Sequence, residues 1–279
     1  MISLIARPAE PIRLIALDLD GTTLRQDKTV GRRTIEALRA AHAGGVEIAL
    51  ASGRMTPAMS ATAEALGIDC CIVSYNGAAV CGRGSAGRQR LFHQPLHSHV
   101  ARELFAFARE RKYQVNFYHD DVIISEDSPH LRPFIEIYKS RTGSPYHLVP
   151  SLHDYMHHAP TKLLLVVDPH VRNDIEAELR PRFGSLATII RTDPEYLEFL
   201  DPRVNKGRGV IKLAEHLGIP MSQVMAVGDG ENDVPMLEVA GFGIAVANAC
   251  ADCRRAARAF TENDNENDAV AEAVERWVL

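Results

Sequence analysis

The chain has 279 residues, of which 46% are hydrophobic and 24% are charged, and this composition excludes a disordered or fibrous protein. The length predicts two domains, or one domain that carries a large insertion. Acidic residues outnumber basic ones by 36 to 31, so the net charge of −5 has the wrong sign for a nucleic-acid-binding surface. The longest apolar runs, such as residues 163–167, are far shorter than the ~20 residues of a membrane span, and the N-terminus lacks a long apolar signal core, so we expect a soluble cytoplasmic protein.

The first third of the chain alternates between strand and helix patterns. Runs rich in β-branched residues and leucine predict strands over residues 12–17, 46–51 and 70–74. Apolar residues at helical spacing predict a helix over 34–43, and Pro57 and Gly67 bracket a second helix. These strands are too apolar to have one face in water, which predicts a parallel sheet covered by helices on both sides.

A different pattern begins after Gly77. The glycine-rich stretch 82–87 predicts a linker, and the residues beyond it predict elements in the order αββ, αβαβ, αββ. One helix is expected from residue 97, further helices are expected over 129–141, 152–157 and 171–183, and strands are expected over 114–118, 122–125, 146–149, 162–167, 186–191 and 196–200.

Regular alternation returns after Asp201. Helices are expected over 207–217, through Met236 and Leu237, and at the C-terminus, where Val270, Val274 and Trp277 share one face, and strands are expected over 224–227 and 242–246. We therefore predict an α/β fold. Its Rossmann-like parallel-sheet core consists of residues 1–84 and 202–279, and an α+β domain of residues 85–201 is inserted into it.

The end of the first strand carries two carboxylates. In open parallel sheets ligands bind at the carboxyl ends of the strands, so polar residues placed there indicate a site. Asp18 and Asp20 lie two positions apart and project to one side of an extended chain, and Gly21 permits a tight turn directly behind them. A solvated acidic turn is the structural alternative for this D-x-D-G-T motif.

Three further strand ends carry polar groups. The Ser52 hydroxyl could receive a phosphate oxygen, Lys206 is a cation at a helix start, and Asp229 and Asp233 are hard oxygen ligands that suit Mg²⁺. Each of these also has an ordinary structural explanation. Ser52 could belong to a common turn, Lys206 could be a surface lysine, and Asp229 and Asp233 could cap a helix. Together with the first pair they exceed what capping requires, and they indicate phosphoryl transfer, which needs cations, a nucleophile and an acid. The sequence contains no Walker-type glycine loop, which argues against nucleotide hydrolysis.

These four motifs, in this order, resemble those of the haloacid dehalogenase-like (HAD) phosphatases, and the inserted αββ(αβαβ)αββ order resembles the C2B cap of their Cof-type subfamily. The resemblance implies that Asp18 is the nucleophile, Asp20 the general acid and base, and Ser52 and Lys206 the phosphate ligands. It also implies Mg²⁺ held by Asp18, the Asp20 carbonyl and Asp229, with Asp233 in support. The stretch Ser74-x-Asn76-Gly77-Ala78 also resembles that subfamily, and the substrate-binding residues that the resemblance implies are Gly53, Arg54, Asn76, Gly77 and Asn232. Ala269 departs from the family pattern, which has Gly there.

The function expected from this pattern is Mg²⁺-dependent hydrolysis of small phosphomonoesters, with sugar phosphates as the foremost substrate class. The reaction is expected to proceed through an aspartyl-phosphate, and the cap is expected to select the organic group of the substrate. A phosphotransferase or phosphomutase that passes the phosphoryl group to a second hydroxyl is the nearest alternative. A catalytically silent ligand-binding protein on the same fold is another, and the intact Asp18 and Asp20 argue against it.

A few other residues leave two interpretations open. Five cysteines, an odd number with two adjacent members, favour a reduced compartment, and Cys250 and Cys253 are either a metal or redox pair or simply the start of a helix. The remaining candidates are calcium-loop positions at Asp264, Glu266, Asp268 and Glu275, a zinc site at His153, His157 and His158, and a substrate contact or plain hairpin turn at Tyr118 and His119.

Overall fold

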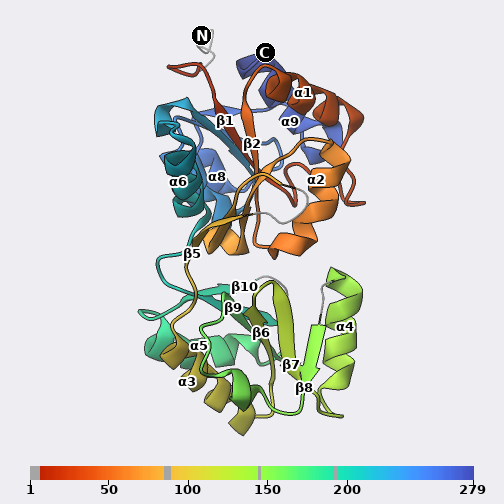
Figure 1. Ribbon diagram of the computed structural model, residues 1–279, viewed down its shortest axis with the longest axis vertical. Coiled ribbons are helices and arrows are strands. Elements are labelled where there is room, and N and C mark those ends of the chain that lie inside the picture. The colour runs from red at the N-terminus through yellow and green to blue at the C-terminus, as the bar shows by residue number, and fades with distance from the viewer. Residues whose placement is uncertain (1–6, 85–88, 144–145, 192–193) are drawn as a thin grey trace. The chain divides into compact units, whose positions relative to one another are not determined.

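A computed structural model describes residues 7–84, 89–143, 146–191 and 194–279 (Figure 1). The chain divides into two compact units, one of Met1–Phe92 with Asn205–Leu279 and the other of His93–Val204. No helix in the described part of the chain is long and apolar enough to cross a membrane.

The first unit is built on an eight-stranded sheet in the order β14-β13-β12-β1-β2-β3-β4-β5. The strands are β1 (Leu14–Asp18), β2 (Glu47–Ala51), β3 (Cys71–Ser74), β4 (Ala79–Cys81), β5 (Arg90–His93), β12 (Val224–Gly228), β13 (Phe242–Ala245) and β14 (Ala259–Phe260). The strands from β14 to β3 pair in parallel, and β4 pairs antiparallel with β3. The predicted parallel-sheet core is therefore confirmed.

Helices cover this sheet in two groups. They are α1 (Arg32–Ala43), α2 (Ser60–Leu66), α6 (Lys206–Leu217), α7 (Val234–Val239), α8 (Ala251–Ala256) and α9 (Ala269–Trp277). Helix α1 packs against α9 and α2, whereas α7 packs against α6 and α8, and the two groups lie on opposite sides of the central strands in Figure 1. Because both faces are covered, the side chains of β1 and β12 are buried, as their continuous apolar runs predict.

The second unit is an α+β domain around a six-stranded sheet, in the order β10-β11-β9-β6-β7-β8. Its strands are β6 (Gln114–His119), β7 (Val122–Glu126), β8 (Tyr146–Val149), β9 (Lys162–Val166), β10 (Thr188–Arg191) and β11 (Tyr196–Leu200), and its helices are α3 (Ser98–Glu110), α4 (Arg132–Thr142) and α5 (Arg172–Phe183). All neighbouring strands pair antiparallel except β7 and β8, which are parallel. The segment expected as a short helix is a 3₁₀ turn over Leu152–Tyr155.

The unit boundaries differ from the predicted ones at residues 84 and 202. Residues 90–93 form a strand of the first sheet, so the chain leaves this unit later than expected. Strands β4, β5 and β14 were not predicted because runs of two to four residues are too short to show a period. Residues 85–88, which include the second half of the predicted linker 82–87, lie outside the described residues.

Candidate active site

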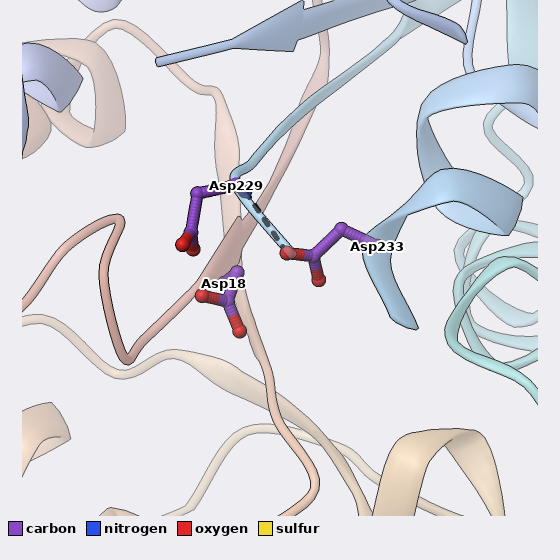
Figure 2. A group of neighbouring side chains, drawn as sticks. All are labelled: Asp18, Asp229 and Asp233. Atoms are coloured by element: carbon purple, nitrogen blue, oxygen red, sulfur yellow. Dashed lines mark hydrogen bonds between the residues drawn. The ribbon is translucent and has the colours of Figure 1, made fainter. Parts of the chain in front are cut away.

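Two parallel neighbouring strands bring the acidic residues together. Asp18 ends β1 and Asp229 follows β12, and these strands pair in register from Leu14 with Val224 to Leu17 with Val227. The carboxyl ends of the two strands therefore meet at one edge of the sheet. Figure 2 shows the result: Asp18, Asp229 and Asp233 each offer an oxygen within 4.8 Å of the others. No other such cluster of three His, Cys, Asp or Glu side chains occurs among the described residues.

Lys206 lies between two members of this cluster, Asp18 and Asp233. Its fully buried ammonium donates hydrogen bonds to Oδ1 of Asp18 and Oδ1 of Asp233, both at 2.5 Å. Burial alone would lower the pKa of this lysine, but the two carboxylates outweigh burial and raise it, so Lys206 is a permanent cation. Asn205 fixes the position of the lysine, because its side chain caps α6 by accepting the Arg208 N–H at 2.8 Å.

The carboxylates carry more negative charge than Lys206 neutralises. Burial and the neighbouring Asp233 raise the pKa of Asp18 well above its ordinary value, although Lys206 acts in the opposite direction. Burial also raises the pKa of Asp229, against a hydrogen bond of 2.8 Å that its Oδ1 accepts from the Thr22 hydroxyl. A raised carboxyl pKa means that the ionised form is disfavoured, so a further cation would stabilise the ionised carboxylates of this cluster.

Both carboxylate oxygens of Asp233 are already bonded to donors of the chain. Oδ1 accepts from Lys206, and Oδ2 accepts from the backbone N–H groups of Asp229 and Gly230, each at 3.0 Å. Asp233 therefore fixes both the lysine and the loop that carries Asp229.

Asp20 lies outside the buried cluster. Its side chain is 42% exposed and forms ion pairs with Arg54, through Nε at 2.8 Å and Nη2 at 2.5 Å, and with Lys28 at 2.8 Å. Partial burial raises the pKa of Asp20, but the hydrogen bonds and charges of Arg54 and Lys28 outweigh burial, and the pKa is lowered. In this arrangement Asp20 is a carboxylate. The expectation that Asp20 contributes to a metal site concerned its backbone carbonyl, not this side chain.

The loops after β2 and β3 are joined by backbone and amide contacts. Ser52 is buried directly after β2, its carbonyl accepts the Asn76 N–H at 2.9 Å, and its hydroxyl accepts the Arg54 N–H at 3.2 Å. The side-chain oxygen Oδ1 of Asn76 in turn accepts a hydrogen bond of 3.1 Å from the side-chain amide of Asn232, which lies in the segment between β12 and α7. Gly53 allows this close approach, because a Cβ on it would lie 3.1 Å from the Asn76 side chain, which would have to shift slightly.

Gly77 allows the start of α6 to approach this loop. Its φ of +97° lies in the left-handed region, and a Cβ would stand 2.2 Å from the Asn205 carbonyl oxygen. Any larger residue would push the start of α6, and Lys206 with it, away from the strand ends. Thus the structure brings Ser52, Gly53, Asn76, Gly77 and Asn232 into one set of loops, next to the elements that carry Asp18 and Lys206.

Two residues of this region were not singled out from the sequence. Thr22, which binds Asp229, is part of the D-x-D-G-T motif, and that motif was the available signal. No sequence motif pointed to Lys28, because a turn of the chain brings it to Asp20. In this turn the Arg25 N–H donates to the Thr29 carbonyl, and Lys28 has a φ of +65°.

The structure shows what most of the other candidate residues contact. In the calcium-loop positions, Asp264 caps a 3₁₀ turn, Glu266 accepts the Gln26 N–H, Asp268 accepts from Arg25 and Thr34, and Glu275 pairs with Arg33. Asp268 also takes the left-handed turn conformation at φ +61°, so Ala269 in place of Gly is free to begin α9. Tyr118 is buried and hydrogen-bonds Tyr138, whereas His119 and His157 both stack on His158.

Replacing Lys206 by Met tests the energetics of the cluster. The change leaves two buried carboxylates without their ammonium, and we expect the free energy of unfolding to fall by about 3–5 kcal/mol near pH 8. Because the folded-state pKa of Asp18 is raised, its protonation favours the folded state as the pH falls, so the loss should be smaller near pH 5. Urea unfolding in the presence of chelator measures both values.

Lys212→Met is the matched control, since Lys212 lies on the same helix and its side chain is 35% exposed beside Glu215. We expect this variant to change the free energy of unfolding by less than about 0.5 kcal/mol. Equal losses in the two lysine variants would contradict the account of the buried cluster.

The chain is similar to known proteins over nearly its whole length. A family model described as haloacid dehalogenase-like hydrolase matches residues 15–274. HMP-PP phosphatase of Cronobacter sakazakii is 30% identical over 237 residues, 85% of each chain, and 5-amino-6-(5-phospho-D-ribitylamino)uracil phosphatase of Bacillus subtilis is 26% identical over 268 residues, 96% of each. Among solved structures, a haloacid dehalogenase-like hydrolase from Bacteroides thetaiotaomicron superposes with a TM-score of 0.84 at 29% identity, covering 95% of this chain and 99% of that one.

The family match and the strand-end motifs lead to the same assignment. Asp18, Lys206, Asp229 and Asp233 form one buried cluster at the carboxyl edge of a parallel sheet, and the family model spans all four. The chain belongs to the haloacid dehalogenase-like hydrolase family and is a phosphatase of its Cof type.

Proposed function

We propose that this phosphatase hydrolyses small phosphomonoesters, with sugar phosphates as the foremost substrate class. The reaction depends on Mg²⁺ and proceeds through an aspartyl-phosphate on Asp18. The observation that carries the proposal is the buried ammonium of Lys206 between Asp18 and Asp233, beside Asp229. Such a site combines an anionic nucleophile with the cation that an incoming phosphoryl group requires. The relative from Bacillus subtilis, named as a phosphatase of a phosphoribityl compound, supports a small phosphorylated substrate.

The acidic cluster fits Mg²⁺ by the chemistry of its donors. All three side chains are carboxylates, the class of ligand that this ion prefers. Burial, together with the neighbouring charge of Asp233, raises the pKa values of Asp18 and Asp229, and a bound cation would oppose both effects. Asp18 and Asp229 would hold the ion directly, with the Asp20 carbonyl, and Asp233 would support them, since its own oxygens are bonded to Lys206 and the loop. The bound ion supplies positive charge that neutralises and orients the phosphoryl oxygens.

The chain's own residues then divide the reaction into two displacements. In the first, a carboxylate oxygen of Asp18 attacks phosphorus, the bond from phosphorus to the ester oxygen breaks, and Asp20 donates a proton to the departing alkoxide. In the second, Asp20 takes a proton from water, the water oxygen attacks phosphorus, and Asp18 is regenerated. Throughout, Lys206 and the Ser52 hydroxyl hold phosphoryl oxygens, while Gly53, Asn76, Gly77 and Asn232 shape the surrounding loops.

Asp20 must change partners during this cycle. Arg54 and Lys28 lower its pKa and hold it as the carboxylate, which is the form needed in the second displacement. The first displacement needs the protonated form. Release of Asp20 from Arg54 and Lys28 is therefore part of the proposed cycle, and Arg54 becomes available to bind substrate.

We assign substrate selection to the inserted unit, His93–Val204, as a cap of the C2B type. The first unit contains the residues proposed for chemistry, and the insertion contributes none of them. Its sequence follows no motif that names a substrate. A panel of phosphorylated metabolites, assayed with and without a sugar acceptor, would identify the preferred ester and would separate hydrolysis from phosphoryl transfer to a second hydroxyl.

Dependence on the metal is the test of the proposed function. Phosphate release from a generic ester should fall to background in excess chelator and return with Mg²⁺, because Lys206 alone does not neutralise Asp18, Asp229 and a phosphate dianion together. Ca²⁺ should compete with Mg²⁺ yet support little turnover, since it takes more ligands in looser geometry and displaces the in-line arrangement. Full activity in chelator, or equal rates with the two ions, would overturn the assignment.

A further inference from the structure

Two cysteines lie beside one another at the start of α8. Cys250 immediately precedes the helix, and its sulfur accepts the backbone N–H of Cys253 at 3.5 Å. These residues occupy the N-cap and N3 positions, whose side chains approach each other. Both are free thiols in the structure. Their spacing is that of C-x-x-C pairs that cycle between dithiol and disulfide.

Both cysteines also contact the loop that carries Asp229. The Cys250 N–H donates to the Asp229 carbonyl at 2.9 Å, and the Cys253 S–H donates to the Gly230 carbonyl at 2.8 Å. The N–H groups of Asp229 and Gly230 donate in turn to Asp233. The acidic loop is therefore held on one side by Asp233 and on the other by the cysteine pair.

Accessibility separates Cys250 from the remaining cysteines. All five cysteines lie in the described part of the chain, and of these Cys250 alone is partly exposed. The Cys253 thiol is buried, so Cys250 is the thiol that meets an oxidant first. The other three, Cys70, Cys71 and Cys81, are buried in or beside β3 and β4.

We propose that Cys250 and Cys253 form a reversible disulfide that weakens metal binding at Asp229. The metal half of this inference rests on the function proposed above, whereas formation of the disulfide does not. The Cys250–Cys253 pair is then a site of reversible oxidation, and its oxidant is a small disulfide such as oxidised glutathione.

The exchange is balanced in two steps. The Cys250 thiolate attacks one sulfur of oxidised glutathione, which breaks that disulfide and releases one glutathione thiolate. Cys253 then loses its proton and attacks the Cys250 sulfur of the mixed disulfide, which releases the second glutathione. In total two cysteine thiols are oxidised to one disulfide, and one glutathione disulfide is reduced to two thiols.

The disulfide acts on the metal loop through the contacts described above. The new S–S bond removes the S–H group that donates to the Gly230 carbonyl. It also shifts Cys250, whose N–H donates to the Asp229 carbonyl. Changes to groups that orient a metal ligand commonly weaken metal binding by 10-fold or more, so we expect about a tenfold rise in the Mg²⁺ dissociation constant. By linkage, saturating Mg²⁺ should favour the dithiol by the same factor, a rise of about 30 mV in its reduction potential.

The experiment compares the reduced and oxidised full-length protein. After treatment with excess oxidised glutathione and removal of the reagent, mass measurement of the fragment that contains both cysteines should show the loss of two hydrogens and no bound glutathione. Titration calorimetry with Mg²⁺ alone should then give the tenfold weaker binding. Reduction with dithiothreitol should restore the original value.

Cys250→Ser is the matched control, because serine caps the helix as well and leaves Cys253 in place. This variant should bind Mg²⁺ as the reduced protein does and should not respond to the oxidant. Absence of the disulfide, Mg²⁺ binding that agrees within about twofold between the two forms, or an equal response in Cys250→Ser would each overturn the inference. If the reduced protein binds no Mg²⁺ at all, the proposed function fails instead, and the mass measurement still decides whether the disulfide forms.

Discussion

Replacing Asp18 by Asn should reduce hydrolysis of every phosphate ester by about 10⁴-fold or more, whatever its leaving group. The amide cannot serve as the anionic nucleophile, so the first displacement fails before any difference between leaving groups matters. Asn is close to Asp in size, and Lys206 keeps its hydrogen bond to Asp233, so the fold should be retained. Steady-state rates with a nitrophenyl ester and a sugar phosphate, together with the mass of acid-quenched protein, measure the effect.

Asp27→Asn is the matched control for this variant. Asp27 lies in the loop that follows β1, and its carboxylate accepts the N–H and the hydroxyl of Thr29 at the surface. This variant should keep the parent rates within about twofold, since surface substitutions away from special features have small effects. A phosphoenzyme in Asp18→Asn, detected as a mass increase of one phosphoryl group, would show that another residue is the nucleophile.

Replacing Asp20 by Asn should separate the substrates that Asp18→Asn treats alike. A poor alkoxide leaving group needs a proton from Asp20, so phosphorylation of the enzyme by a sugar phosphate should slow by about 10²- to 10⁴-fold. A nitrophenolate leaves without one, so its first displacement should survive. The second displacement lacks the base that activates water for either substrate. Aspartyl-phosphate should therefore accumulate on Asp18 after a burst of nitrophenol.

Rapid-quench kinetics and intact-protein mass measurement test this second prediction. The burst amplitude should approach one nitrophenol per enzyme, and the trapped mass should correspond to one phosphoryl group. If the variant slows phosphorylation by the sugar phosphate and by the nitrophenyl ester to the same degree, Asp20 is not the general acid. Lys28→Met, which removes one partner of Asp20 but keeps the carboxylate, should show no trapped phosphoenzyme.

The sequence by itself determined the fold class and the positions of the acidic residues. Buried parallel strands leave continuous apolar runs, and such runs predicted β1, β2 and β12 with the polar residues that follow them. Since the carboxyl ends of parallel strands share one edge, the sequence also indicated that Asp18 and Asp229 lie together. Both signals are local, in that each is contained in a short stretch of chain.

Only the tertiary structure decided the partners of these side chains. Lys206 is 188 positions from Asp18, and its full burial between two carboxylates depends on how α6 packs against the loop at Gly77. The contact of Cys253 with the Gly230 carbonyl, absent from any motif, depends in the same way on the placement of α8. A single sequence shows which residues an element carries, whereas pKa shifts and ion pairs depend on distances and burial, which arise only when elements far apart in the chain pack together.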